Sequence, residues 1–506
     1  MKRKGIGGLI IFGILLFSVL IGSGVSDAKE KVFTIAQAGE PPTLYPTSKV
    51  GDSNPTNNVA QLINEKLIDW DWKKGRAVPV LAESFRHVDE LTFEVKIRKN
   101  ISFTNGEPLD AEAVKYSLEQ IWKEPFFGTL TKEWKEIEVV DKYTVRIHSK
   151  KPNPVSWGWA MPKMFIYPPK YHQKMGEGYM LQPLGTGPYL LKEWVRGSKI
   201  ELVANKSYWG EKPKLDRVIW RGIPEASTRV AALETGEVDL ISFVPASYAD
   251  RIKSNKNLVL RTVPGTRGFG VAFDGRKPPF SDKRVRQAAN YAIDKDAIIR
   301  HILGGYAQKL GGQLLTPAYV GHNPNLKDYP YDPEKAKRLL REAGYPNGFE
   351  VTLDYGIGRF AQIDEVCQAV AGQLEKVGIR VKLNAMEHGT FIKGITSGNH
   401  SPLYNIGFQG GPEGYDHLEY FSLRGTVLAH IYLNKEYSDV LDKAASAPEL
   451  EQRKRLIQKA LEIANEDPFA IYLYTADSLF AQSKRVRNWE PDPSDLIYVT
   501  GVDVAE

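Results

Sequence analysis

In one stretch of the chain, apolar residues recur with the spacing of a strand, a helix and a second strand in turn. They alternate over 349–353, return every three or four positions over 366–377, and alternate again over 379–383. A strand, a helix and a strand joined this closely form a βαβ unit, whose two strands are parallel neighbours in one sheet. Ligands tend to bind beyond the carboxyl ends of such strands. The loop over 355–360, which leaves the first strand at that end, is therefore a candidate binding loop.

The same patterns predict further elements along the chain. Asp110 and Asp332 are typical helix caps, Pro333 is typical of a first helical residue, and Ser281 is expected to start another helix. Predicted strands cover 92–97, 143–147, 270–273, 404–408 and 470–474. Helices and strands alternate without internal repeats, so the chain is expected to be a mixed α/β protein.

The amino terminus has the three-part layout of a secretory signal peptide. Basic residues at 2–4 precede an apolar run over 6–21, and Ala28 fits the small-residue site before a cleavage point. The apolar run is short for a membrane span of about 20 residues, although an uncleaved anchor is the alternative. A lipoprotein is excluded because the only cysteine, Cys367, is far from that site. We expect a signal peptide over 1–28 and an exported, periplasmic protein.

Composition narrows the class of protein further. The chain has 506 residues, of which 42% are hydrophobic and 25% charged, with one cysteine. These values exclude wholesale disorder, a collagen-like repeat and a disulfide scaffold. The formal net charge is +6, and a dedicated nucleic-acid binder would usually carry more.

No catalytic or metal-binding motif stands out. The nine histidines form no His-Glu-x-x-His pattern, one cysteine cannot make a thiolate site, and neither a P-loop nor a Gly-x-Ser-x-Gly elbow is present. We therefore expect a binding protein without cofactor or metal rather than an enzyme. An exported hydrolase with an unfamiliar active site is the alternative from another class.

Several segments, in the same order along the chain, resemble family 5 of the extracellular solute-binding proteins. That family is the dipeptide- and oligopeptide-binding type, which serves ABC importers. The matching segments include 81–109, which begins Leu-Ala-Glu-Ser-Phe and ends Asn-Gly-Glu-Pro-Leu, 185–189 (Gly-Thr-Gly-Pro-Tyr), 233–239 (Leu-Glu-Thr-Gly-Glu-Val-Asp), 278–288 and 331–345. So many ordered matches make the resemblance far more specific than any one of them.

The resemblance implies an α/β, two-lobed periplasmic-binding-protein fold of type II, with a hinge of two crossover segments. Lobe I is expected over 29–261, with an extra subdomain at about 68–182. Lobe II is expected over 262–475, and 476–506 return to lobe I. The implied role is to capture a peptide-like solute by hinge closure and deliver it to ABC permease subunits in the membrane. The protein would act as a monomer, without nucleic acid, and a regulatory module that presents its ligand to a membrane sensor is a further alternative.

The resemblance also points to a binding loop in lobe II. In peptide-binding members, an aspartate after a strand that ends in an aromatic residue pairs with the amino group of the peptide. Here that strand is predicted over 404–408, and the aspartate position falls on Gly411. Burying an ammonium group without a carboxylate partner costs on the order of several kcal/mol of binding free energy. A free amine would then need Glu413 or Asp416 to turn inward, although both acids can equally be solvated turn residues.

Other candidate ligand-binding residues lie in loops at the expected cleft edge. Arg359 is the strongest, because its guanidinium group can clamp a carboxylate or phosphate with two hydrogen bonds. The remaining candidates are Tyr355, His388, Gln409, Tyr415, Phe269 and Trp157. The missing aspartate favours, as alternative, a non-peptide solute such as an oligosaccharide, an opine or a nickel complex.

Overall fold

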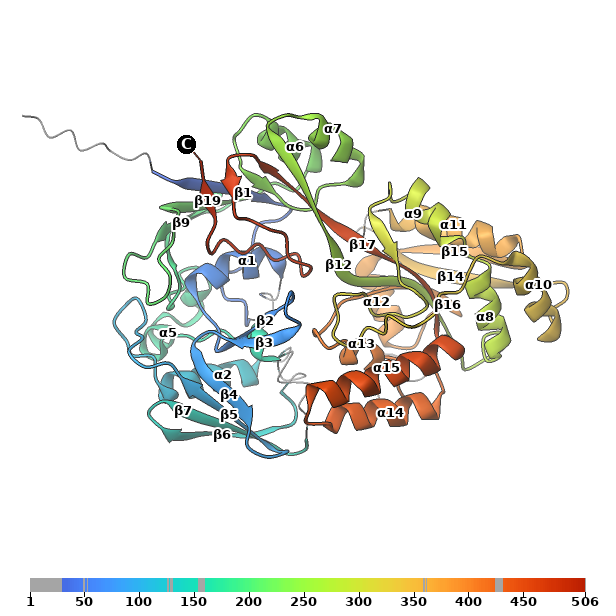
Figure 1. Ribbon diagram of the computed structural model, residues 1–506, viewed down its shortest axis with the longest axis horizontal. Helices are drawn as coiled ribbons and strands as arrows, with labels where there is room; N and C mark the ends of the chain where they lie inside the picture. Colours follow the sequence, from blue (N-terminus) through green and yellow to red (C-terminus); the bar gives the residue numbers. More distant parts are fainter. Residues whose placement is uncertain are drawn as a thin grey trace, which may run out of the picture.

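The computed structural model describes residues 30–48, 51, 53–124, 127, 131–152, 160–357, 360, 362–423 and 431–505. It shows two lobes side by side, joined by two long strands (Figure 1). These strands are β12 (Leu258–Phe273) and β17 (Ala470–Ser483). We call lobe I the part of the chain before β12 together with the part after β17, and lobe II the part between them.

One sheet runs through both lobes. Among the described residues it has eleven strands in the order β15-β14-β16-β12-β17-β11-β1-β10-β9-β8, with β13 paired to β17. Lobe I contributes β1 (Val32–Gln37), β8 (Tyr189–Val195), β9 (Lys199–Ala204), β10 (Arg217–Gly222) and β11 (Leu240–Ile241). Lobe II contributes β13 (Ala307–Lys309), β14 (Phe349–Ile357), β15 (Ile379–Glu387) and β16 (Leu403–Phe408).

Strands β12 and β17 form the connection between the lobes. They pair antiparallel from Leu258 with Ser483 to Ala272 with Ala470, and the register shifts between Pro264 and Gly268. A bulge of this kind removes ladder hydrogen bonds and bends a strand locally. The lobe boundaries expected at residues 261 and 475 fall inside these two strands and stay a prediction.

The βαβ unit expected from the hydrophobic spacing is confirmed. Strands β14 and β15 are parallel neighbours, and helix α11 (Ile363–Glu375) connects them. The helix buries Val366, Cys367, Val370 and Leu374 against the sheet. The loop predicted over 355–360 begins too early, because residues 355–357 still belong to β14, and 358–359 lie outside the described residues.

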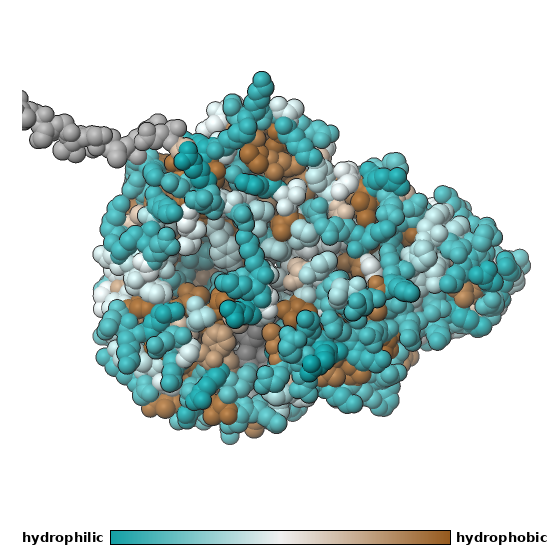
Figure 2. Space-filling model, viewed as in Figure 1, coloured by the Kyte–Doolittle hydropathy of each residue, from teal (hydrophilic) through white to brown (hydrophobic). Residues whose placement is uncertain are grey.

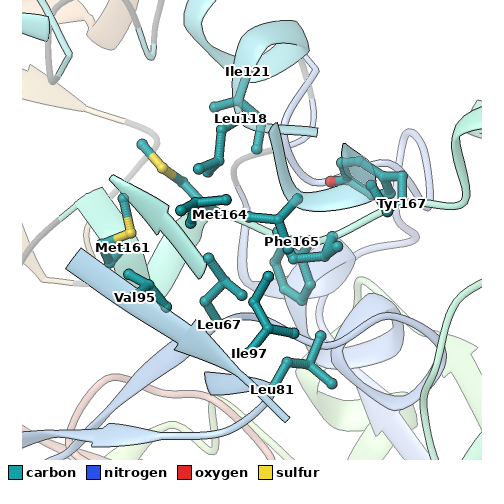
Figure 3. Packing of buried hydrophobic residues seen from close by; sticks show 14 of the residues in the cluster. Leu67, Leu81, Val95, Ile97, Leu118, Ile121, Met161, Met164, Phe165 and Tyr167 are labelled. Atoms are coloured by element: carbon teal, nitrogen blue, oxygen red, sulfur yellow. The ribbon is translucent and has the colours of Figure 1, made fainter. Parts of the chain in front are cut away.

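Lobe I contains a second, smaller sheet with its own core. Its strands are β4 (Ala82–His87), β5 (Thr92–Ile97), β6 (Trp134–Asp141) and β7 (Thr144–Ser149), in the order β4-β5-β7-β6, with β2 (Ile68–Asp71) and β3 (Arg76–Pro79) as a separate pair. Helix α2 (Ala111–Lys123) packs on it through Leu118 and Ile121, which lie close to Met164 in Figure 3. The limits of the expected subdomain stay a prediction.

The remaining helices cover the two lobes. Lobe I has α1 (Asn54–Ile63), α5 (Pro169–Met175), α6 (Ala226–Glu234) and α7 (Ala249–Ser254). Lobe II has α8 (Lys283–Tyr291), α9 (Lys295–His301), α10 (Pro333–Glu342), α12 (His388–Thr396), α13 (Tyr415–Glu419), α14 (Lys435–Ser446) and α15 (Leu450–Glu466). The tail after β17 forms β18 (Val486–Arg487) and β19 (Asp503–Val504) in lobe I. Within the described ranges, none of these helices combines the length and the apolar character that crossing a membrane requires.

The predicted caps are confirmed except at one helix. The side chain of Asp110 accepts from the backbone N–H of Ala113, and Asp332 accepts in the same way at the start of α10. The expectation that Ser281 starts a helix is wrong by one residue. Asp282 caps α8 instead, because its carboxylate accepts from the N–H of Arg284.

Candidate functional site

A cleft of about 570 Å³ lies between the two lobes. Its volume falls in the range of about 300–1,000 Å³ that is usual for small-molecule sites. In Figure 2, hydrophobic residues lie on both sides of the hollow at the centre of the view, and hydrophilic residues cover most of the remaining face. The lining residues are Ser53, Asn54, Asn57, Gln61, Lys66, Asp69, Trp70, Trp72, Pro162, Lys163, Phe165, Phe243, Ser494, Asp495, Leu496 and Tyr498 from lobe I, Phe360, Gln409, Gly410 and Pro412 from lobe II, and Arg267 on β12.

Aromatic rings line both sides of this cleft. Trp70 ends in an indole N–H that has no acceptor among the described residues, and Trp72 follows two positions later. On the side of lobe II, the ring of Phe360 meets Phe269 edge to face at 5.1 Å between centroids. Such walls can pack against the apolar part of a solute while polar groups fix its orientation.

The rim of lobe I presents one aromatic side chain in an unusual backbone conformation. Phe243 has a φ of 52°, in the left-handed region, and its side chain is 46% exposed. A bulky residue rarely adopts this conformation without a reason in the surrounding structure. Here the buried Arg229 donates to the carbonyl oxygen of Phe243 at 2.9 Å, and it also donates to the carbonyl oxygens of Ile223 and Pro224. The protein therefore holds this ring at the edge of the cleft.

Charged groups of both signs line the cleft. Lys66 donates to Asp69 at 2.9 Å, and its ammonium group lies 5.3 Å from the centre of the Phe165 ring. Arg267 donates to the carbonyl oxygen of Gly407 at 2.7 Å and to the side chain of Gln409 at 2.8 Å. The lining can thus contact both an anionic and a cationic group of a solute.

Of the predicted binding residues, Gln409 lies in the cleft lining. Its amide group donates to the hydroxyl oxygen of Thr266 at 2.7 Å and accepts from Arg267. Gly411 is next to Gly410 and Pro412, both of which line the cleft. The loop after β16 therefore reaches the cleft, as the resemblance implied.

Glu413 and Asp416 make contacts inside lobe II. Both oxygens of Glu413 accept from Arg453 at 2.7 Å, so this carboxylate already has a counter-ion. Asp416 accepts from the backbone N–H of Gly411 at 3.0 and 2.9 Å. Burial raises the pKa of Asp416 to about 6. Tyr415 is buried beside them at the start of α13.

Three further predicted residues lie behind the cleft surface. The hydroxyl group of Tyr355 donates to Asp364 on α11, and Phe269 is stacked on Tyr474 at 5.1 Å. His388, at the start of α12, has its ring 5.8 Å from that of Phe360. Arg359 and Trp157 lie outside the described residues.

Several lining residues were not anticipated from the sequence, above all Lys66, Phe243, Arg267 and Asp495. Each sits in a segment whose local pattern predicts only a strand or a turn. The pair Trp70 and Trp72 supplies part of the aromatic wall of lobe I.

His417 gives a prediction on pH. It is buried below the cleft loop, where its Nε2 lies 3.3 Å from the hydroxyl oxygen of Tyr319. Burial lowers the pKa of His417 to about 3, whereas the unfolded chain has the ordinary value of about 6.5. The unfolded state therefore binds the proton more readily. The stability that the neutral His417 contributes is present above pH 6.5 and is lost as the pH falls toward 3. On acidification from pH 7.5 to pH 5, His417 should therefore lower the free energy of unfolding by about 2 kcal/mol.

The measurement compares urea unfolding of the protein and of its His417→Gln variant at both pH values. The comparison is needed because the raised pKa of Asp416 acts in the opposite direction, as its stability contribution is lost when the pH rises through about 6. On acidification, the free energy of unfolding of the variant should fall by about 2 kcal/mol less than that of the unchanged protein. Equal losses would show that His417 does not stay neutral in the folded state.

Two lobes that share one sheet and enclose a cleft lined by aromatic and charged side chains are typical of a ligand-binding protein. The chain belongs to family 5 of the bacterial extracellular solute-binding proteins, whose middle-region model matches residues 76–425. The predictions of the family, of the two-lobed fold and of a solute-binding role are confirmed. The family is one of binding proteins.

Individual relatives agree with this assignment. The chain is 33% identical over 391 residues to the glutathione-binding protein GsiB of Escherichia coli O1:K1, covering 76% of this chain and 74% of the relative. The periplasmic binding protein DppA of Helicobacter pylori, solved with the peptide STSA, is 25% identical at a TM-score of 0.74, over 94% of this chain and 98% of that one. The binding protein AgaA of A. tumefaciens R10, solved with agropinic acid, is 27% identical at a TM-score of 0.74, over 94% and 99%.

Proposed function

We propose that this protein is the exported substrate-binding component of an ABC transporter, which captures a peptide-like solute between its lobes and delivers it to membrane permease subunits. The observation that supports this most is the cleft itself, which both lobes line with aromatic rings and with charges of both signs. In this proposal residues 1–28 act as a signal peptide, and the mature chain is a periplasmic monomer.

Glutathione is our first candidate for the solute. The similarity to a glutathione-binding protein supports it, and so does the charge of the cleft. Among the described residues the lining has three basic side chains, Lys66, Lys163 and Arg267, and two acidic ones, Asp69 and Asp495. A tripeptide with two carboxylates and one ammonium group carries a net negative charge, and a lining with a positive excess suits it.

The proposed mechanism is closure about β12 and β17. The register shift between Pro264 and Gly268 offers a place where the two strands can bend. A solute that contacts both lobes binds the closed form better than the open form, and this difference in affinity is what drives closure. No bond of the solute is made or broken.

Specific residues have distinct roles in this proposal. Gln409 contacts the solute, Arg359 clamps a carboxylate, and Trp157 contacts the solute from lobe I. Phe269 and Tyr355 support the loop after β14, beside His388. The proposed role of Glu413, Tyr415 and Asp416 is to shape the loop that contains Gly411, because the hydrogen bonds of Glu413 and Asp416 lie within lobe II.

An opine is the second candidate. Gly411 stands where peptide-binding relatives are expected to carry an aspartate, and the similar protein AgaA was solved with agropinic acid.

A thermal-shift screen of the mature chain tests the proposed function. Glutathione, short peptides, opines, oligosaccharides and nickel complexes are compared at equal concentration. A solute at about 100 times its dissociation constant should stabilise the folded state by about 2.7 kcal/mol, which corresponds to a rise of roughly 3 °C for a chain of this length. A shift with glutathione or peptides supports the proposal. A shift with opines alone favours the second candidate, and no shift with any peptide-like solute contradicts the first.

A further inference from the structure

This inference rests on the proposed function and concerns the group that receives the solute's positive charge. When the proposed closure buries a peptide-like solute with a free amine, it takes an ammonium ion out of water. Burying that ion requires a carboxylate partner. Among the described residues, the acidic side chains that line the cleft are Asp69 and Asp495.

Asp69 already has a partner. Its Oδ1 accepts from the ammonium group of Lys66 at 2.9 Å and from the backbone N–H of Trp70 at 2.9 Å. Lys66 is itself buried and packed over Phe165, so it cannot move away without losing that contact. The negative charge of Asp69 is therefore balanced inside lobe I.

Asp495 is placed differently. None of the ion pairs found among the described residues involves its carboxylate, although the hydroxyl group of Ser478 is a hydrogen-bonding partner. Burial raises the pKa of Asp495 to about 6, and the nearby charge of Asp492 acts in the same direction. The positive charge of Arg267, across the cleft on β12, favours the ionised form. An arriving ammonium ion would favour it further.

The backbone around Asp495 is fixed by the polar face of helix α1. Asn54 donates to the carbonyl oxygen of Ser494 at 3.2 Å, Gln61 donates to that of Ile497 at 3.1 Å, and Asn58 accepts from the N–H of Ile497 at 2.8 Å. Asp495 itself has a φ of 64°. Three side chains of one helix thus hold this turn against the cleft, and a carboxylate held in advance loses little entropy when it binds a ligand.

We propose that Asp495 of the C-terminal tail is the partner of the solute's ammonium group, and that it selects solutes with a free amine. The cationic end of the solute then binds to lobe I. Its carboxylates face Arg267 and the loops of lobe II.

The test uses calorimetric titration with glutathione and with N-acetylated glutathione, in which the ammonium charge is removed. The unchanged protein should bind the acetylated form at least tenfold more weakly. Asp495→Asn should weaken binding of glutathione at least tenfold and leave the affinity for the acetylated form unchanged. Asparagine adopts the left-handed conformation about as readily as aspartate, so the turn should keep its shape. Asp495→Gly, which also favours this conformation, serves as a second variant.

Asp492→Asn is the matched control. Asp492 belongs to the same turn and accepts from the backbone N–H of Ser494 at 2.9 Å, but it is not part of the cleft lining. Its variant should bind glutathione as tightly as the unchanged protein. If the unchanged protein binds glutathione and the Asp495 variants bind it equally well, the inference fails while the proposed function stands. If the unchanged protein binds neither form, glutathione is not its solute and the inference fails, while the thermal-shift screen with other peptides decides the proposed function separately.

Discussion

Replacing Arg453 with methionine is expected to lower the free energy of unfolding by about 3–5 kcal/mol, because it leaves the carboxylate of Glu413 buried without a counter-ion. The two side chains are 8% and 5% exposed, and two hydrogen bonds of 2.7 Å join them. Arg453 also donates to the carbonyl oxygens of Ala447 and Pro448 at 3.0 and 2.8 Å. Urea unfolding at pH 7 measures the effect.

The control for this prediction is the double variant Arg453→Met and Glu413→Leu. Removing both charges leaves no buried ion unpaired, so most of the lost stability should return. A single variant that costs less than about 1 kcal/mol would show that the pair is effectively solvated.

Gly410→Ala is expected to weaken solute binding by displacing the loop after β16. A Cβ at this position would lie 1.8 Å from Oδ2 of Asp416, which no heavy-atom contact permits. The carboxylate of Asp416 would have to move, and its two hydrogen bonds to the N–H of Gly411 would be lost. Since Gly410 and Gln409 line the cleft, the displaced loop should lower solute affinity by at least tenfold, or about 1.4 kcal/mol. Calorimetric titration measures the change.

Gly372→Ala is the matched control, because it adds the same methyl group as Gly410→Ala at a position away from the cleft. Gly372 lies in helix α11, and a Cβ there would meet nothing within 4 Å. The substitution should leave affinity unchanged and raise stability slightly, because alanine loses less conformational freedom in a helix than glycine does. An unchanged affinity in Gly410→Ala would mean that the loop after β16 has no part in binding.

Much of the local structure could be predicted from the sequence because local patterns determine it. The βαβ unit from β14 to β15 follows from apolar spacing alone, and Asp110 and Asp332 are caps because a carboxylate satisfies the free N–H groups of a first turn. The choice between Ser281 and Asp282 failed, since both residues can cap a helix and only the position of the following backbone decides.

The site was less predictable because it is assembled from distant segments. Gln409 was found through the resemblance, whereas Asp495 reaches the cleft only because side chains of α1 hold the tail in place. The pairing of Glu413 with Arg453 joins residues 40 positions apart, so the sequence alone could not show that this acid is already neutralised. Apolar spacing reports which side chains are buried but not which distant polar groups meet them.

The most direct test of the central claim is a crystal structure of the mature protein grown with the solute that gives the largest thermal shift. We expect the solute between the lobes, in contact with Asp495 and Arg267 and enclosed by the loop that contains Gln409. A solute bound outside this cleft, on the surface of either lobe alone, would contradict the account.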